Sequence, residues 1–168
     1  MASNPGAEKP KFDIKKVYLR DVSFESPESP HIFTQQDFAP QIGVQIRIDH
    51  TALEPSGHFE VVLIVTATAK HEDKSIFLVE VHQAGIFEIS GIPEDRLKAV
   101  LEVACPNVLL PFAREAVADL ANKGGFPQLL ITPINFEALY ANKRSRAATE
   151  SESETPSGNG AGATEATA

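Results

Sequence analysis

Residues 41–49 carry the clearest alternation of apolar and polar side chains in the chain. Apolar residues occupy every second position, and these are Ile42, Val44, Ile46 and Ile48. The residues between them include Gln41, Gln45, Arg47 and Asp49. Since successive side chains of a strand point to opposite faces, this segment is predicted to be a half-buried β-strand.

Three further segments have strand character, at about 12–24, 59–70 and 75–87. The polar link at 71–74 between the last two predicts an antiparallel hairpin. The first segment is ambiguous, because neither of its sides is purely apolar. Strict alternation puts one set of residues on one side, Val17, Leu19, Asp21, Ser23 and Glu25, and a second set on the other, Ile14, Lys16, Tyr18, Arg20, Val22 and Phe24.

From Pro93 onwards the period changes from that of a strand to that of a helix. Glu94 and Asp95 place acid at the positive end of a first helix. A second, amphipathic helix follows Cys105, and Gly124-Gly125 with Pro127 ends it. Asn135 is a candidate cap for a short helix that contains Phe136, Leu139 and Tyr140.

Strands followed by helices predict an α+β fold, namely a four-stranded antiparallel sheet with helices packed on one face. A long crossover loop, about 25–40, follows the first strand, and its apolar residues argue against simple disorder. Segments 1–10 and 147–168 are too polar to bury much apolar area, so both termini are predicted to be disordered, the second as an acidic tail. Residues 11–146 are expected to form one domain.

The chain has 168 residues and a formal net charge of −8. That balance argues against a nucleic-acid partner, which needs clustered Lys and Arg. No apolar run approaches the roughly 18–20 residues that cross a bilayer, and the first residues lack the apolar core of a secretory signal. We therefore expect a cytoplasmic protein without membrane insertion, and the single cysteine fits a reducing compartment.

Catalytic, metal and nucleotide motifs are not evident. Cys105 has no histidine near it in sequence, so a buried cysteine is the favoured interpretation. The five histidines do not form a pair at metal-ligand spacing, and Gly124-Gly125 follows a helix instead of opening one as a phosphate loop does. The sequence thus predicts no enzyme, no cofactor and no bound metal.

The fourth strand segment has two unlike faces. Phe77, Val79 and Val81 form an apolar face, while Leu78 lies beside Glu80 on the other. On general exposure of apolar residues, the mixed face is interpreted as an ordinary solvated surface. The apolar face and the stripe on the second helix offer more apolar surface than a lone subunit needs, so we name as oligomer-interface candidates Phe77, Val79, Val81, Leu109, Phe112, Ala116 and Leu120.

Three long motifs carry a family resemblance. They are DVSFESPESPHIF at 21–33, GIFEISGI at 85–92 and CPNVLLPFAREAVADLANKGGFPQLLITPINFEALY at 105–140. In this order they resemble the SecB family of bacterial protein-export chaperones, over roughly residues 12–142. The resemblance implies an ATP-independent holdase, a homotetramer built as a dimer of dimers, which binds unfolded precursor proteins in the cytosol and delivers them to the SecA motor.

The resemblance also implies particular sites. Carried over residue by residue, SecA would contact Asp21, Glu25, Leu78 and Glu80 on the exposed face of the sheet. Unfolded clients would lie along a groove beside the crossover loop, with Ile32, Phe33 and Phe38 as candidates. A tryptophan is common in this loop of the family, whereas Phe38 stands here, which keeps the aromatic ring and loses the indole donor.

Two other classes of protein stay open at this point. One is a small-ligand-binding or enzymatic α+β domain with a pocket beneath the 25–40 loop, which would need convergent polar groups there. The other is an adaptor or assembly protein that uses the same oligomer without chaperone activity. Protection of an unrelated unfolded client against aggregation would separate the adaptor from the chaperone.

Overall fold

The computed structural model describes residues 9–35 and 39–153, with side chains up to 149. Phe38 and most of both termini lie outside the described residues, so the predictions on them stay predictions. The chain divides into two compact units, one up to Phe136 and one from Glu137 onwards. The sheet, the groove and all candidate residues below belong to the first unit.

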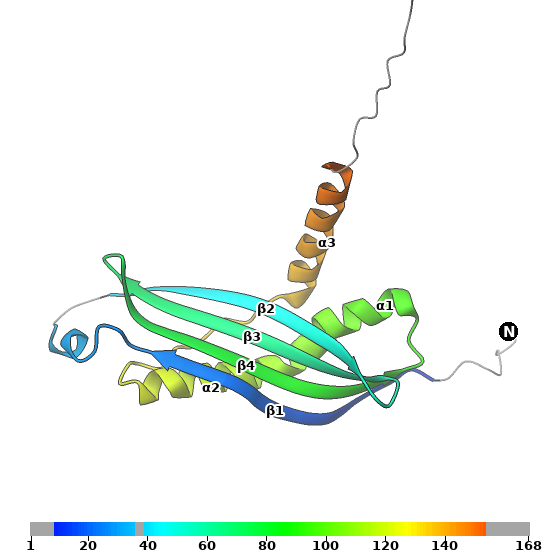
Figure 1. Ribbon diagram of the computed structural model, residues 1–168, viewed down its shortest axis with the longest axis horizontal. Coiled ribbons are helices and arrows are strands. Elements are labelled where there is room, and N and C mark those ends of the chain that lie inside the picture. The colour runs from blue at the N-terminus through cyan, green and yellow to red at the C-terminus, as the bar shows by residue number, and fades with distance from the viewer. Residues whose placement is uncertain (1–8, 36–38, 154–168) are drawn as a thin grey trace, which may run out of the picture. The chain divides into compact units, whose positions relative to one another are not determined.

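The first unit is built on one antiparallel sheet of four strands, as predicted (Figure 1). The strands are β1 (Lys11–Glu25), β2 (Gln41–Leu53), β3 (His58–His71) and β4 (Lys74–Ser90), in the spatial order β1-β4-β3-β2. The predicted hairpin joins β3 to β4, and its turn residues Glu72 and Asp73 both have positive φ, as a tight primed turn requires. Because β1 and β2 are the two edges, the segment between them must cross the end of the sheet. That segment contains a short 3₁₀ turn, η1 (His31–Thr34).

Strict alternation assigned the faces of β1 wrongly, because the strand contains two irregularities. Its register against β4 shifts between Ile14 and Lys16 and again between Leu19 and Asp21, which leaves Lys15 and Arg20 as extra residues. Each extra residue exchanges the two faces of the strand. With both bulges counted, one face of β1 is apolar throughout, and it consists of Phe12, Ile14, Val17, Leu19, Val22 and Phe24, whose partners on β4 all have odd numbers.

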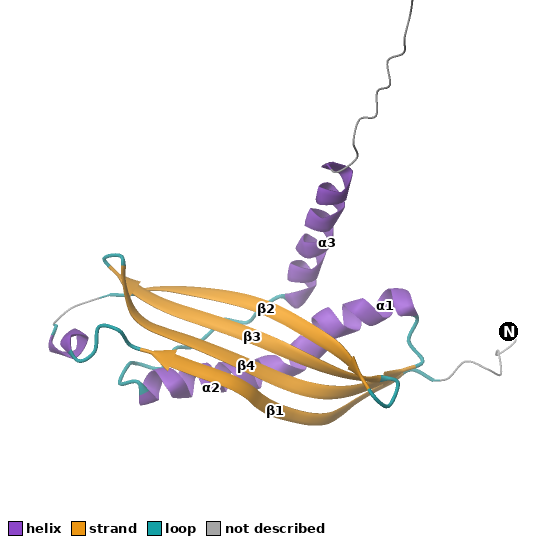
Figure 2. Ribbon diagram, in the orientation of Figure 1, coloured by secondary structure: helices purple, strands orange, loops and turns teal. Residues whose placement is uncertain are grey.

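Helices cover one face of the sheet, as predicted (Figure 2). They are α1 (Glu94–Ala99), a π-helical turn η2 (Val100–Ala104) and α2 (Cys105–Lys123), and they follow one another without a break. α2 packs mainly on β4 and β3. We call the covered side of the sheet its core face and the opposite side its open face.

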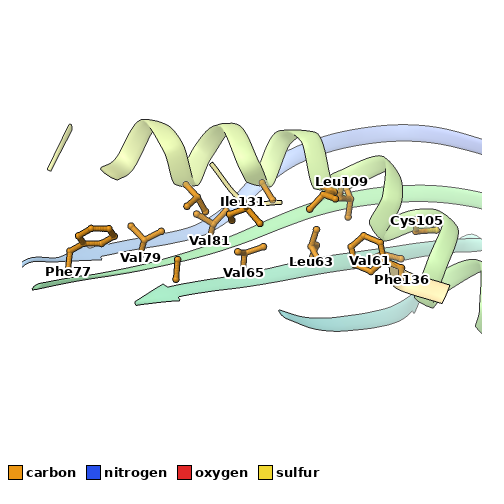
Figure 3. Close-up of a cluster of buried hydrophobic side chains, with 14 of the residues drawn as sticks. Val61, Leu63, Val65, Phe77, Val79, Val81, Cys105, Leu109, Ile131 and Phe136 are labelled. Atoms are coloured by element: carbon orange, nitrogen blue, oxygen red, sulfur yellow. The ribbon is translucent and has the colours of Figure 1, made fainter. Parts of the chain in front are cut away.

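The hydrophobic core fills the space between the core face and α2. Val61, Leu63 and Val65 of β3 lie beside Val79 and Val81 of β4 below the helix (Figure 3), and all five are fully buried. Burial of this kind contributes roughly 1.5–3 kcal/mol for each large aliphatic or aromatic side chain. The core therefore fixes which face of every strand points away from solvent.

The last helix, α3 (Phe136–Ser153), begins at the boundary between the two units. Phe136 is buried in the core of the first unit. The rest of the helix is polar and mostly exposed, and Arg144 lies over the ring of Tyr140, 5.8 Å from its centroid. α3 runs to Ser153, so residues 147–153, which we assigned to the tail, are helical.

Candidate functional site

An apolar groove lies between the crossover segment and the loop that follows α2. Its volume is about 480 Å³, and it is open to solvent at Phe33. Ile32, Phe33 and Pro40 come from the crossover segment, Ile42 and Phe77 from β2 and β4, and the residues from Gly125 to Leu129 form the opposite wall. Among the described residues, Gln35 and Gln128 are the polar members of this lining and none carries a charge. The groove is therefore suited to apolar and aromatic groups.

Three phenylalanine rings, Phe33, Phe77 and Phe126, line one end of this groove, and the ring of Phe24 packs against two of them. The ring of Phe126 lies at their centre, 4.8 Å from Phe77, 5.2 Å from Phe33 and 6.3 Å from Phe24 between centroids. Tilted pairs at such distances are favourable beyond their buried area. Phe126 is almost fully buried, whereas Phe33 is 51% exposed. The cluster thus has a rigid base and one ring that a ligand can reach.

The glycine pair after α2 lets these rings approach the backbone. A Cβ atom on Gly124 would lie 2.0 Å from the ring of Phe24, a separation that no side chain tolerates. Gly125 has a φ of +87°, which L residues rarely adopt, and Phe33 lies just above it. These two glycines therefore end the helix and also make room for the aromatic cluster.

Two of the three client-groove candidates, Ile32 and Phe33, line the groove. Phe33 lines the groove with half of its surface exposed, and Ile32 lies in the wall with only 2% exposed. Phe38 is outside the described residues. The residues that our sequence analysis missed are on the far wall, and they include Phe126 and Leu129. An aromatic residue directly after a Gly-Gly helix end was the available signal.

The four residues that the resemblance assigned to SecA lie together on the open face. Glu25 pairs with Leu78 across β1 and β4, and Ser23 pairs with Glu80 in the next row. Asp21 pairs with His82 one row further on. Since directly paired residues point to the same side, Asp21, Glu25, Leu78 and Glu80 share one surface, which we call the acidic patch.

Hydrogen bonds fix the one carboxylate of this patch that comes from β4. Glu80 accepts a hydrogen bond of 2.7 Å from His82 Nε2 and one of 3.1 Å from Thr66 Oγ1. These bonds, first the one from His82, lower the pKa of Glu80 and keep it ionised. Within the described residues, neither Asp21 nor Glu25 forms a salt bridge. Their negative charge is therefore available to a partner.

The far end of the open face has a different arrangement of charge. Glu88 accepts from both Lys11 and Lys15 at 2.6 Å, and Lys15 also reaches Asp13 at 2.8 Å. The two lysines lower the pKa of Glu88 to about 2, and the hydrogen bonds with Asp13 and Glu88 raise the pKa of Lys15 to about 12. Charges here are paired with one another, in contrast to those of the acidic patch.

Four of the seven oligomer-interface candidates were wrong. Phe77, Val79, Val81 and Leu109 are between 0% and 4% exposed, because they pack between the sheet and α2 of the same subunit. A side chain with no free surface cannot contact a second copy.

The other three candidates keep free surface on α2. Phe112 is 45% exposed, and Ala116 and Leu120 are half-buried. Phe112 and Ala116 line a shallow depression of about 550 Å³ together with Leu19 of β1. The exposed apolar residues on the core face of β1 extend this surface, and they are Phe12, Ile14, Leu19 and Val22. The subunit therefore has exposed apolar side chains on α2 and on the core face of β1.

Cys105, the first residue of α2, is buried in the core, as predicted. Burial raises the pKa of its thiol to about 12, so the reactive thiolate is strongly disfavoured. Within the described ranges, no three His, Cys, Asp or Glu side chains gather closely enough to hold a metal ion. None of the helices in these ranges is both long and apolar enough to span a membrane.

Taken together, these features define a binding protein: an α+β subunit with an apolar groove at one end of its core face and an acidic patch on its open face. The family model of SecB, described as preprotein translocase subunit SecB, matches residues 5–147. The chain therefore belongs to the SecB family of protein-export chaperones.

Individual relatives agree with this assignment. The chain is 56% identical over 131 residues to the protein-export protein SecB of Hydrogenovibrio crunogenus, which covers 78% of this chain and 87% of that protein. It is 52% identical over 134 residues to the protein-export protein SecB of Nitrosococcus oceani, covering 79% and 81% respectively.

A solved structure shows the same fold. It is that of a SecB-like chaperone from Mycobacterium tuberculosis, in complex with a peptide from an antitoxin. The TM-score is 0.57 at 16% sequence identity, and the match covers 74% of this chain and 91% of the other.

Proposed function

We propose that this chain is an ATP-independent holdase of the cytoplasm, which binds unfolded precursor proteins and keeps them competent for export. Membership of the SecB family supports the export role. The observation that carries the binding step is the aromatic groove, which is apolar and open to solvent. The proposed activity is binding without bond chemistry.

The chemistry of the groove suits clients of many sequences. Its lining offers rings and aliphatic side chains, so it rewards apolar side chains in general and imposes few hydrogen-bond requirements. Binding to the unfolded state withholds that state from folding and from aggregation by mass action. A small-ligand site would instead need convergent polar groups, and the described lining contributes two glutamines.

Replacement of Phe33 tests the groove with little risk to the fold, because half of this ring is exposed. Phe33→Ser is expected to reduce protection of an unfolded, unrelated client from aggregation, measured by light scattering of the client after dilution from denaturant. Phe33→Leu is the matched control, since it keeps an apolar side chain at the same position and should keep most of the protection. Full protection by Phe33→Ser would contradict the groove as the client site.

We also propose that the SecA motor docks on the acidic patch. Unpaired Asp21 and Glu25, the ionised Glu80 and the half-buried Leu78 together make a negatively charged surface with an apolar element. A basic partner segment with an apolar side chain would complement it. Family membership supports SecA as that partner.

The proposed assembly is a homotetramer, a dimer of dimers. The apolar surface formed by Phe12, Ile14, Leu19, Val22 and Phe112 supports it, because so much exposed apolar surface is unusual for a monomer. Light scattering at micromolar concentration should give about four subunits, in line with the closed symmetry of most homo-oligomers. Leu19→Glu combined with Phe112→Glu should lower that mass, and a wild-type monomer would contradict the assembly.

A further inference from the structure

His82 lies within the acidic patch, although neither the sequence pattern nor the family resemblance drew attention to it. On β4 it is two residues from Glu80, on the same side of the strand. Across the sheet it pairs with Asp21 of β1 and with Ile64 of β3. Its side chain is 22% exposed. The imidazole therefore lies between two of the carboxylates that we assign to the docking site.

The hydrogen bond from His82 determines the orientation of Glu80. A carboxylate can only accept, so the Nε2 atom 2.7 Å from Glu80 Oε1 must carry a proton. Thr66 occupies the other oxygen of the same carboxylate. With both oxygens bonded to the protein, Glu80 is held in one orientation before a partner arrives, which lowers the cost of ordering it on binding.

The charges around His82 come from three strands. Arg20 and Asp21 of β1 and Arg47 and Asp49 of β2 line an open depression of about 490 Å³ together with His82. β4 contributes Glu80, through its hydrogen bond with His82. The side of β3 that faces it is apolar, with Val62 and Ile64.

The two arginines of this depression are already engaged. Arg20 pairs with Glu60 at 2.9 Å and Arg47 with Asp49 at 3.4 Å. Of the residue types present at this place, histidine is the one whose charge ordinarily changes between roughly pH 5 and 8.

We propose that His82 is a positioning residue of the docking site, and that its protonation sets the affinity of the acidic patch for a basic partner. The neutral imidazole orients Glu80 and leaves the full negative charge of the patch in place. The imidazolium form cancels one of those charges and repels a basic segment. By linkage, a bound basic partner must in turn disfavour protonation of His82. This inference rests on the proposed docking of SecA.

The test compares SecA binding at about pH 8 and about pH 6, on either side of ordinary histidine titration. For the wild type, we expect affinity to fall about three-fold or more towards low pH, the size of one added charge at a partly exposed site. His82→Gln keeps an N–H donor for Glu80 but cannot titrate, so its affinity should fall distinctly less. Because SecA itself also titrates, the informative quantity is the difference between the two pH dependences.

Two matched variants separate this role from general effects. His58→Gln makes the same change on the same face of the sheet, but on β3, where His58 pairs with Glu88 at the end away from the acidic patch. This variant should keep the pH dependence of the wild type. His82→Ala removes the donor, and at about pH 8 it should bind SecA more weakly than His82→Gln does. Calorimetry in buffers of different ionisation enthalpy gives a second readout, since SecA binding near pH 6 should release fewer protons from His82→Gln than from the wild type.

The outcomes separate the role of His82 from the docking of SecA on the acidic patch. An equal pH dependence and equal proton release in wild type and His82→Gln would overturn the role of His82, and would leave the docking site intact if Asp21→Ala still weakens SecA binding. If Asp21→Ala and Glu80→Ala bind SecA as tightly as the wild type at both pH values, the docking site itself is wrong, and the inference falls with it.

Discussion

The two faces of the sheet are made by alternate residues of the same strands, yet they present different chemistry. On the core face the rows are apolar, α2 covers their middle, and the uncovered end is the aromatic groove. On the open face a small apolar cluster of Val62, Ile64 and Ala84 lies in the middle, with paired charges at one end and the acidic patch at the other. Phe77 and Leu78 illustrate the contrast, because these neighbours belong to the groove and to the patch respectively. One sheet thus has an apolar groove on one side and a negatively charged surface on the other.

The largest expected effect comes from a charge on the core face. Val81 is fully buried against the helix, so Val81→Asp places an unpaired carboxylate in the core and should destabilise the subunit by about 3–5 kcal/mol. Thr68→Asp makes the same carboxylate on the open face and should cost less than about 1 kcal/mol. Urea denaturation measures both. Similar losses for the two variants would show that the faces do not differ as described.

A second prediction sharpens the account of the groove. Gly124→Ala drives a methyl group into the ring of Phe24, so it should destabilise the protein by about 1–3 kcal/mol through overpacking. Gly43→Ala is the control, because no atom lies within 4 Å of its Cβ position and an alanine suits a strand at least as well. Thermal unfolding should show a lower midpoint for the first variant alone. A normal midpoint for Gly124→Ala would mean that Phe24 and Gly124 are not in contact.

The smallest expected effect concerns the paired charges at the far end of the open face. Folding lowers the pKa of Glu88 to about 2. The ionised carboxylate therefore stabilises the fold fully at pH values above the pKa that Glu88 has in the unfolded chain. This contribution disappears as the pH falls towards 2. Glu88→Gln should therefore lower the melting midpoint slightly near neutral pH, and the difference from wild type should shrink in acid. Because the partners are partly exposed, added salt should also shrink it. A difference that is constant with pH would exclude this origin.

The sequence predicted most of the architecture, and the failures have physical causes. Strand β2 alternates without irregularity, so its apolar face was assigned correctly. In β1 a single extra residue at Lys15 and another at Arg20 exchange the faces, and neither residue type marks a bulge. Asp21 and Glu25 could still be placed on one face, because no irregularity falls between them.

The binding surfaces were less predictable than the fold. Periodicity showed that Phe77, Val79 and Val81 are buried, but it cannot tell whether the same subunit or a second copy covers them. Phe126 was missed for a related reason, since its place in the groove depends on a loop meeting the crossover segment from the opposite side. His82 became visible only when the register of the strands was known.

The central claim is that clients and SecA bind to opposite sides of the sheet, and binding of both to the same set of variants tests it most directly. The affinity of an unfolded client and of SecA would be measured for wild type, Phe33→Ser and the double variant Asp21→Ala with Glu80→Ala. We predict that Phe33→Ser loses client affinity and keeps SecA affinity. The double variant should lose SecA affinity, most at low salt, and keep client affinity. If either variant loses both affinities while it remains folded and assembled, the two partners share a surface and the account is contradicted.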